Sequence, residues 1–121
     1  MVACPYTAKS FNWEEPNWAE GMEQVVNPDV SRRMKGVVEK CSFCSHRLIK
    51  AREDADAEQR EIREDDYTPA CAEVCPTNAI IFGDLENEKH QVYDLKNSNR
   101  AYRLHDDLGT EPKVYYLALE D

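Results

Sequence analysis

The sequence predicts a small α+β fold built from short strands, short helices and long loops. Its apolar runs are brief and are interrupted by Gly, Pro and charged residues. Two of its five cysteines, Cys4 and Cys75, are followed directly by proline, which interrupts regular structure. With 121 residues, the chain has room for one domain with a modest hydrophobic core.

The first half is predicted to hold little regular structure before one helix. Residues 7–30 mix aromatic side chains with prolines and a glycine and keep no period for long, so we expect an irregular, packed connection. Residues 45–64 contain good helix formers but few apolar side chains, which predicts a solvated helix or a mobile insertion. Arg60 and Glu64 are four positions apart, a spacing that favours an ion pair on that helix.

The second half alternates predicted strands with short helical turns. Residues 79–85 form an apolar run rich in strand formers, which predicts a buried strand. Residues 90–97 predict one or two helical turns, and residues 103–109 another, with Gly109 as a left-handed C-cap. Residues 113–119 fit a final strand.

Composition argues against several classes of function. Charged residues make up 32% of the chain and the net charge is -9, which disfavours binding to nucleic acid or anionic membranes. No run approaches the roughly 18 apolar residues of a spanning helix, so we expect no direct membrane span. The chain shows no phosphate-binding glycine loop, nucleophile elbow or HExxH helix, so we predict that it is not catalytic on its own.

The acidic stretch at residues 53–66, EDADAEQREIREDD, has two interpretations. The simpler one is a solvated face of the helix. The other is a docking patch for a positively charged redox partner, whose association would then depend on salt.

The cysteine spacing is the most specific signal in the sequence. Five cysteines are an odd number, which argues against a closed disulfide framework. Cys41 and Cys44 form a C-x2-C pair, and after 26 residues Cys71 and Cys75 form C-x3-C followed by proline. Thiolates select zinc, Cu(I) or iron-sulfur clusters, and four-cysteine zinc sites usually combine two C-x2-C pairs. C-x3-C-P instead ends the bacterial ferredoxin pattern C-x2-C-x2-C-x3-C-P, so the spacing favours iron-sulfur clusters.

The ferredoxin pattern also suggests how the cysteines divide. Its fourth cysteine ligates a different cluster from the first three. We therefore assign Cys41, Cys44 and Cys71 to one cluster and Cys75 to a second. Asn78 follows where the backbone must turn, and Asn tolerates positive φ better than other residues except Gly.

Cys4 and Pro5 repeat the end of the same pattern without a cysteine before them. The missing cysteine would stand four positions earlier, immediately before Met1. We therefore expect that residues 1–121 are the C-terminal part of a longer iron-sulfur domain, cut inside a cysteine motif, with an acidic insertion at about residues 45–68.

These residues resemble a known family, the four-cluster ferredoxin-like electron-transfer subunits of molybdopterin oxidoreductase complexes. Polysulfide and DMSO reductases, the quinone reductase complex and alternative complex III use such subunits. The matching stretches are ACPYTAKSFNW, NPDVSRRMKGVVEKCSFCSHR, REIREDDYTPACAEVCPTNAIIFGDL and NRAYRLHDDLGTEPKVYYL. The resemblance implies a ferredoxin-like iron-sulfur domain fragment with long cluster-binding loops.

In that family, four cysteine groups pair in nested fashion to hold [4Fe-4S] clusters. The resemblance implies that Cys4 completes a cluster of the missing second group. Cys41, Cys44 and Cys71 would take a fourth ligand from the missing first group, and Cys75 would complete that group's own cluster. No cluster would then be complete within residues 1–121.

The family also implies partners and a location. Its members relay electrons between a membrane quinone-reacting subunit and a molybdopterin-type or cytochrome subunit. The resemblance places such a chain in a bacterial membrane-associated complex, with the periplasmic side favoured over the cytoplasmic side.

The residues leave two alternatives open. Cys4 can close one site together with Cys41, Cys44 and Cys71, or four thiolates from Cys41 to Cys75 can surround a single zinc ion. The second alternative would make the chain a zinc-stabilised structural or interaction module.

One residue departs from the family pattern. Thr7 stands where relatives often carry Gly, and a β-branched residue is costly at positive φ. Either the turn at Thr7 has ordinary φ, or the loop is distorted.

Overall fold

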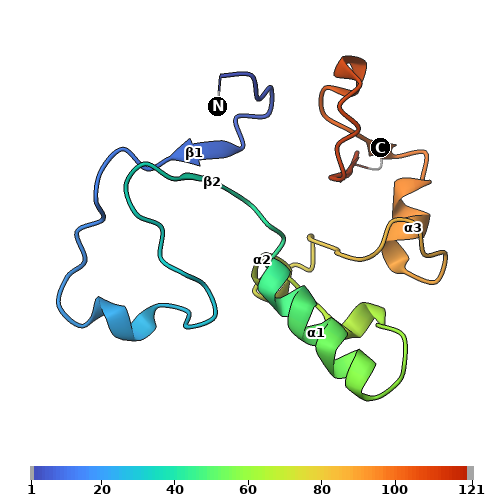
Figure 1. Cartoon of the computed structure of the whole chain (residues 1–121). Helices are drawn as coiled ribbons and strands as arrows, with labels where there is room; N and C mark the ends of the chain where they lie inside the picture. Colours follow the sequence, from blue (N-terminus) through green and yellow to red (C-terminus); the bar gives the residue numbers. More distant parts are fainter. Residues whose placement is uncertain (1, 120–121) are drawn as a thin grey trace. The chain divides into compact units, whose positions relative to one another are not determined.

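The structure is a computed structural model that describes residues 2–119, and it separates into two units, Met1–Ile49 and Lys50–Asp121 (Figure 1). Short strands and short helices follow one another along the chain and are joined by long loops. The predicted α+β class is therefore confirmed, and the short elements are consistent with a ferredoxin-like fragment.

The first unit is organised by one antiparallel strand pair. Strand β1, Lys9–Phe11, pairs with β2, Val38–Lys40, so that Phe11 lies opposite Val38. The sequence analysis predicted no strand at β1, because its three residues show no extended alternation. The strand forms because it finds a partner almost 30 positions further along the chain, which local pattern cannot reveal.

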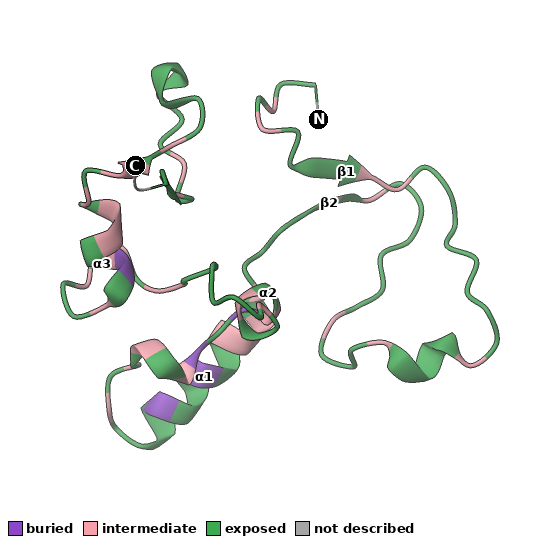
Figure 2. Ribbon diagram, turned by 180° about the vertical axis from the view of Figure 1, so that it is seen from behind, coloured by how far each residue is buried: buried purple, intermediate pink, exposed green. Residues whose placement is uncertain are grey.

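A long loop of residues 12–37 connects the two strands (Figure 1). Two backbone hydrogen bonds close its base, from Asn12 N to Val37 O at 3.0 Å and from Gly36 N to Asn12 O at 2.8 Å. Its regular structure is the 3-10 helix η1, Met22–Val25. The prediction that residues 7–30 form a packed connection is wrong, because no residue from 2 to 49 is buried (Figure 2).

Helix α1, Ser45–Ala57, ends earlier than the predicted range 45–64. Gln59 adopts a left-handed φ of 53°, and the Arg60 N–H donates to the Ala55 carbonyl at 3.0 Å, which is the Schellman pattern of a helix end. None of the helices between residues 2 and 119 combines the length and the apolar composition needed to cross a membrane.

The second unit has a small hydrophobic core. Its centre is Tyr67, whose ring meets Phe82 edge to face at a centroid distance of 4.9 Å. Two short helices flank Tyr67, the 3-10 helix η2 at Glu64–Asp66 and α2 at Ala70–Glu73. The buried residues of this unit are Ala51, Ala55, Tyr67, Pro69 and Val92 (Figure 2).

Helix α3, Gln91–Lys96, confirms the helical turns predicted at residues 90–97. Its buried residue Val92 packs where Gly83 leaves room, because a Cβ atom at Gly83 would lie only 2.8 Å from Val92 Cγ2. Gly83 is therefore needed for close packing and not for an unusual backbone angle.

The C-terminal segment forms a second two-stranded sheet. Strand β3, Ala101–Tyr102, pairs antiparallel with β4, Tyr116–Leu117, and the rings of Tyr102 and Tyr116 stack at 5.6 Å. The predicted strand at residues 113–119 is confirmed but shorter. Between the strands, the 3-10 helix η3, Asp106–Leu108, ends at Gly109 with φ 63°, as predicted for a left-handed cap.

The buried strand predicted at residues 79–85 is wrong. In the part of the chain that the structure describes, strands pair only as β1 with β2 and β3 with β4. Residues 79–85 find no strand to pair with, and Ile80 and Ile81 remain 45% and 38% exposed. An apolar run rich in strand formers becomes a strand only when a hydrogen-bonding edge is available to it.

Candidate metal centre

The loop that follows Cys4 wraps backbone N–H groups around its sulfur. The Thr7 N–H donates to the Cys4 carbonyl at 3.5 Å and closes the turn. The N–H groups of Ala8 and Tyr6 point at the thiol and lower the pKa of Cys4, with Lys9 adding a smaller electrostatic contribution. Cys4 is thus held in an environment that favours its thiolate form.

Thr7 itself adopts a left-handed φ of 51°. The first of the two possibilities left by the sequence, an ordinary φ at this position, is therefore wrong. The turn keeps a conformation suited to glycine with a β-branched residue in it, at a conformational cost. Residues kept in such a conformation are concentrated at functional sites.

The loop after Cys75 has the same design. The Asn78 N–H donates to the Cys75 carbonyl at 3.2 Å, and Asn78 has φ 51°, which confirms the positive φ expected there. The Ala79 N–H donates to Cys75 Sγ at 3.3 Å, and the Thr77 hydroxyl lies 3.6 Å from the same sulfur. Chiefly through the Thr77 hydroxyl and then the Ala79 N–H, the pKa of Cys75 falls to about 7.

The Cys41 to Cys44 segment forms a third sulfur-centred turn. The Phe43 N–H donates to Cys41 Sγ at 3.4 Å, and both Phe43 and Cys44 have left-handed φ, 53° and 52°. The Cys44 carbonyl then accepts from the Arg47 N–H at 2.8 Å, which starts helix α1. The turn from Cys41 to Cys44 therefore leads directly into the first turn of the helix.

Strained backbone is concentrated beside the cysteines. Seven non-glycine residues in the described chain have left-handed φ, and four of them stand in the three cysteine loops: Thr7, Phe43, Cys44 and Asn78. Such conformations cost free energy and persist where the surrounding structure requires them, often at functional sites. The strain therefore points to the same loops as the cysteine spacing.

Cys71 is positioned by a residue that the sequence analysis missed. Pro69 is fully buried, and its carbonyl accepts from the Ala72 N–H at 3.0 Å to begin α2. This helix carries Cys71 in its first turn and leads directly into Cys75. The available signal was the position of Pro69 just before the cysteine, since proline favours helix starts.

All five cysteines are free thiols, with Cys41 and Cys71 exposed and the other three partly exposed. Within neither unit of the described chain do three Cys, His, Asp or Glu side chains lie close enough together to hold a metal ion. The predicted ligands divide between the units, with Cys4, Cys41 and Cys44 in the first and Cys71 and Cys75 in the second. Free cysteine thiols that accept hydrogen bonds from backbone N–H groups are nevertheless suitable ligands for an iron-sulfur cluster or for zinc.

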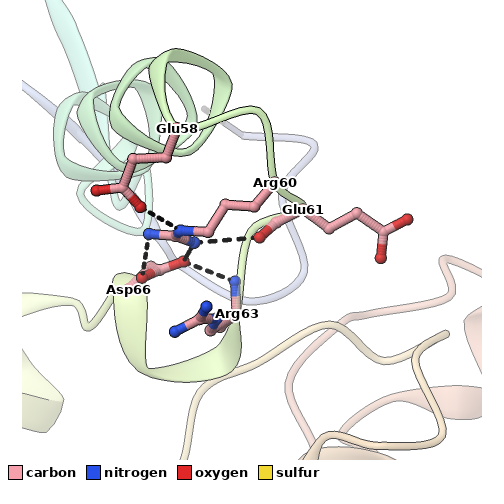
Figure 3. A network of polar contacts seen from close by, with 5 residues as sticks. All are labelled: Glu58, Arg60, Glu61, Arg63 and Asp66. Atoms are coloured by element: carbon pink, nitrogen blue, oxygen red, sulfur yellow. Dashed lines mark hydrogen bonds and ion pairs between the residues drawn. The ribbon is translucent and has the colours of Figure 1, made fainter.

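One arginine connects several parts of the acidic stretch at residues 53–66. Arg60 donates to both carboxylate oxygens of Asp66, at 2.5 and 3.0 Å, and to Glu58 at 2.5 Å (Figure 3). The pKa of Asp66 is lowered mainly by this contact and then by the Arg63 N–H. The ion pair expected between Arg60 and Glu64 is wrong, because the helix has ended before either residue.

Glu64 has another role in the second unit. Its carboxylate accepts from the Gln91 N–H at 2.9 Å, at the start of α3, and so links η2 to α3. Beside it, His90 Nδ1 accepts from the Asp84 N–H at 2.9 Å. No local signal in the sequence predicts this contact, because His90 stands alone in a polar stretch.

No protein-family model matches the chain. Sequence comparison finds similar proteins along almost all of it. A menaquinone reductase iron-sulfur cluster-binding subunit of Nitratidesulfovibrio vulgaris is 50% identical over an alignment of 121 positions that covers 98% of the chain and 48% of that relative. An Hdr-like menaquinol oxidoreductase iron-sulfur subunit of Archaeoglobus fulgidus is 36% identical over 98% of the chain and 41% of its own length.

An arsenate respiratory reductase iron-sulfur subunit of a Shewanella species is 30% identical over 97% of the chain and 56% of its own length. The chain thus spans about half the length of the curated relatives it matches.

Proposed function

This chain is homologous over nearly its whole length to the iron-sulfur subunits of oxidoreductase complexes, and we propose that it relays single electrons through [4Fe-4S] clusters. The observation that carries this proposal is the set of three cysteine turns, each with a backbone N–H directed at a sulfur, in a chain with such relatives. When bound, a cluster supplies the electron-accepting and electron-donating centre.

The chain's own residues prepare the ligands. Amide N–H groups from Ala8 and Ala79 stabilise negative charge on the sulfur atoms of Cys4 and Cys75, and these two thiols therefore ionise more readily. The turns also fix the direction of each sulfur. In this proposal the protein sets ligation, hydrogen bonding and burial, and thereby the potential of each cluster.

We assign the ligands as the cysteine pattern suggests. Cys41, Cys44 and Cys71 bind one cluster, and Cys75 and Cys4 each complete a different one. The remaining ligands come from outside residues 1–121, as part of a longer protein like the relatives of about twice this length. The acidic segment around residues 45–68 is an insertion in that domain.

Two of the relatives are named for menaquinone or menaquinol, which supports a quinone-linked partner. We propose that electrons pass between a quinone-reacting membrane subunit and a molybdopterin-type or cytochrome subunit. The complex lies at a bacterial membrane, with this chain on the periplasmic side, and the chain is not catalytic by itself.

The test is iron, sulfide and zinc analysis with EPR spectroscopy of the anaerobically purified full-length protein. We expect several [4Fe-4S] signals, with one lost in Cys41→Ser and a different one lost in Cys75→Ser. Ser42→Ala changes the same turn between Cys41 and Cys44 without removing a thiol, and it should keep every signal. Identical spectra for the two cysteine variants would refute the assignment to separate clusters. A colourless protein with one zinc per chain would identify a structural zinc module instead.

A further inference from the structure

The two Cys-Pro loops share their backbone turn but differ in the side chains that the turn carries. In both, the third residue after cysteine donates to the cysteine carbonyl and has φ 51°, and the fourth is an alanine whose N–H points at the sulfur. The second residue after cysteine is Tyr6 in one loop and Thr77 in the other. The loops therefore form a natural pair with matching turns and different side chains at this second position.

That hydroxyl is directed at the sulfur. Thr77 Oγ1 lies 3.6 Å from Cys75 Sγ, within hydrogen-bonding range for sulfur. A thiolate bound to iron has no proton to give, so in that state Thr77 must be the donor. At Cys4, the donors that lower the thiol pKa most are the backbone N–H groups of Ala8 and Tyr6.

We propose that Thr77 is a positioning residue that raises the reduction potential of the cluster ligated by Cys75, through a hydrogen bond from its hydroxyl to the cysteine sulfur. The inference rests on the proposed function, because it assumes that Cys75 binds a cluster. It goes beyond that function by assigning an electron-tuning role to a residue that is not a ligand.

The direction follows from charge. Reduction adds one electron to the cluster and its thiolates, so the reduced state carries more negative charge on the sulfur atoms. A hydrogen-bond donor stabilises this state more than the oxidised one and raises the potential. Removing the hydroxyl should therefore make that cluster harder to reduce.

The experiment is an EPR-monitored redox titration of the anaerobically purified full-length protein. Thr77→Val keeps the shape but removes the hydroxyl, whereas Thr77→Ser keeps the hydroxyl. We expect Thr77→Val to lower the reduction equilibrium constant of the Cys75 cluster by about threefold to tenfold, tenfold being about 59 mV for one electron. Thr77→Ser should stay near the wild type, and the signal lost in Cys75→Ser identifies the cluster concerned.

A reciprocal pair in the other loop tests the same bond in the opposite direction. Tyr6→Thr places a threonine hydroxyl at the position that matches Thr77. Tyr6→Val gives a side chain of the same shape without a hydroxyl. The Cys4 cluster should have a higher potential in Tyr6→Thr than in Tyr6→Val. This pair decides the question if Thr77→Val fails to keep its cluster.

Several results would overturn the inference while leaving the proposed function intact. They are wild-type potential in Thr77→Val with full iron and sulfide, an equal shift in Thr77→Val and Thr77→Ser, or equal potentials in the Tyr6 pair. A wild-type protein without iron and sulfide would instead overturn the proposed function, and this inference with it.

Discussion

The two units carry parts of one cysteine set but differ in how far they support their own structure. In the first unit no described residue is buried, and Trp13 and Val25 are 72% and 78% exposed. In the second, buried Tyr67 and Pro69 lie just before Cys71. The second unit therefore positions its cysteines on its own core, whereas the first unit has no such core and, under the proposed function, is held by its clusters.

Removing the clusters should produce the largest difference in behaviour between the two units. If the proposed clusters bind, chelating iron anaerobically should abolish amide-exchange protection in β1 and β2, because that unit buries no apolar side chain to replace the lost ligands. Part of the protection in α1 and α3 should remain. Hydrogen-exchange mass spectrometry before and after chelation measures this, and equal loss in both units would break the comparison.

Truncating the core of the second unit should have the next largest effect. Tyr67→Ala removes a buried ring that packs against Phe82 and should lower the free energy of unfolding by about 3 kcal/mol. The matched change Trp13→Ala in the first unit should cost less than about 0.5 kcal/mol, because that side chain is 72% exposed. Urea denaturation of the cluster-loaded protein compares them, and similar costs would contradict the difference between the units.

Adding a side chain at Gly83, where Val92 packs closely, should lower the free energy of unfolding by an intermediate amount. Gly83→Ala places a Cβ atom 2.8 Å from Val92 Cγ2 and should destabilise the second unit by about 1–3 kcal/mol. The double variant Gly83→Ala with Val92→Ala should cost less than the sum of the single variants, because the smaller side chain makes room. Strict additivity in a double-mutant cycle would show that this contact is not the cause.

The smallest expected effect is the loss of stability at low pH that comes from the acidic stretch at residues 53–66. The pKa of Asp66 is lowered in the folded state, so its pairing with Arg60 stabilises the fold above the ordinary aspartate value of 3.8. That contribution is lost as pH falls below 3.8 through the folded pKa. The thermal midpoint of Asp66→Asn should therefore depend less on pH in this window than the wild type. Glu61 joins the network in Figure 3 through its backbone carbonyl, which accepts from Arg60 at 3.1 Å, so Glu61→Gln should behave as wild type.

Local features of the sequence predicted much of the candidate site. The cysteine spacing, the positive φ at Asn78 and the cap at Gly109 depend on a few adjacent residues, so they can be read from the chain. The existence of α1 was also predictable, because a run of helix formers needs little tertiary support. Its early end at Gln59 was not, because no glycine marks it.

Features that depend on distant residues required the fold. The pairing of β1 with β2, the missing strand at residues 79–85 and the contact from Glu64 to Gln91 each depend on which segments meet. Thr7 shows the same limit within one loop, because its residue type argues against the φ that the turn imposes. The order of residues thus specified the candidate ligands and their immediate turns. The partners that complete strands, caps and core came from long-range contacts, whose free energy is distributed over many residues.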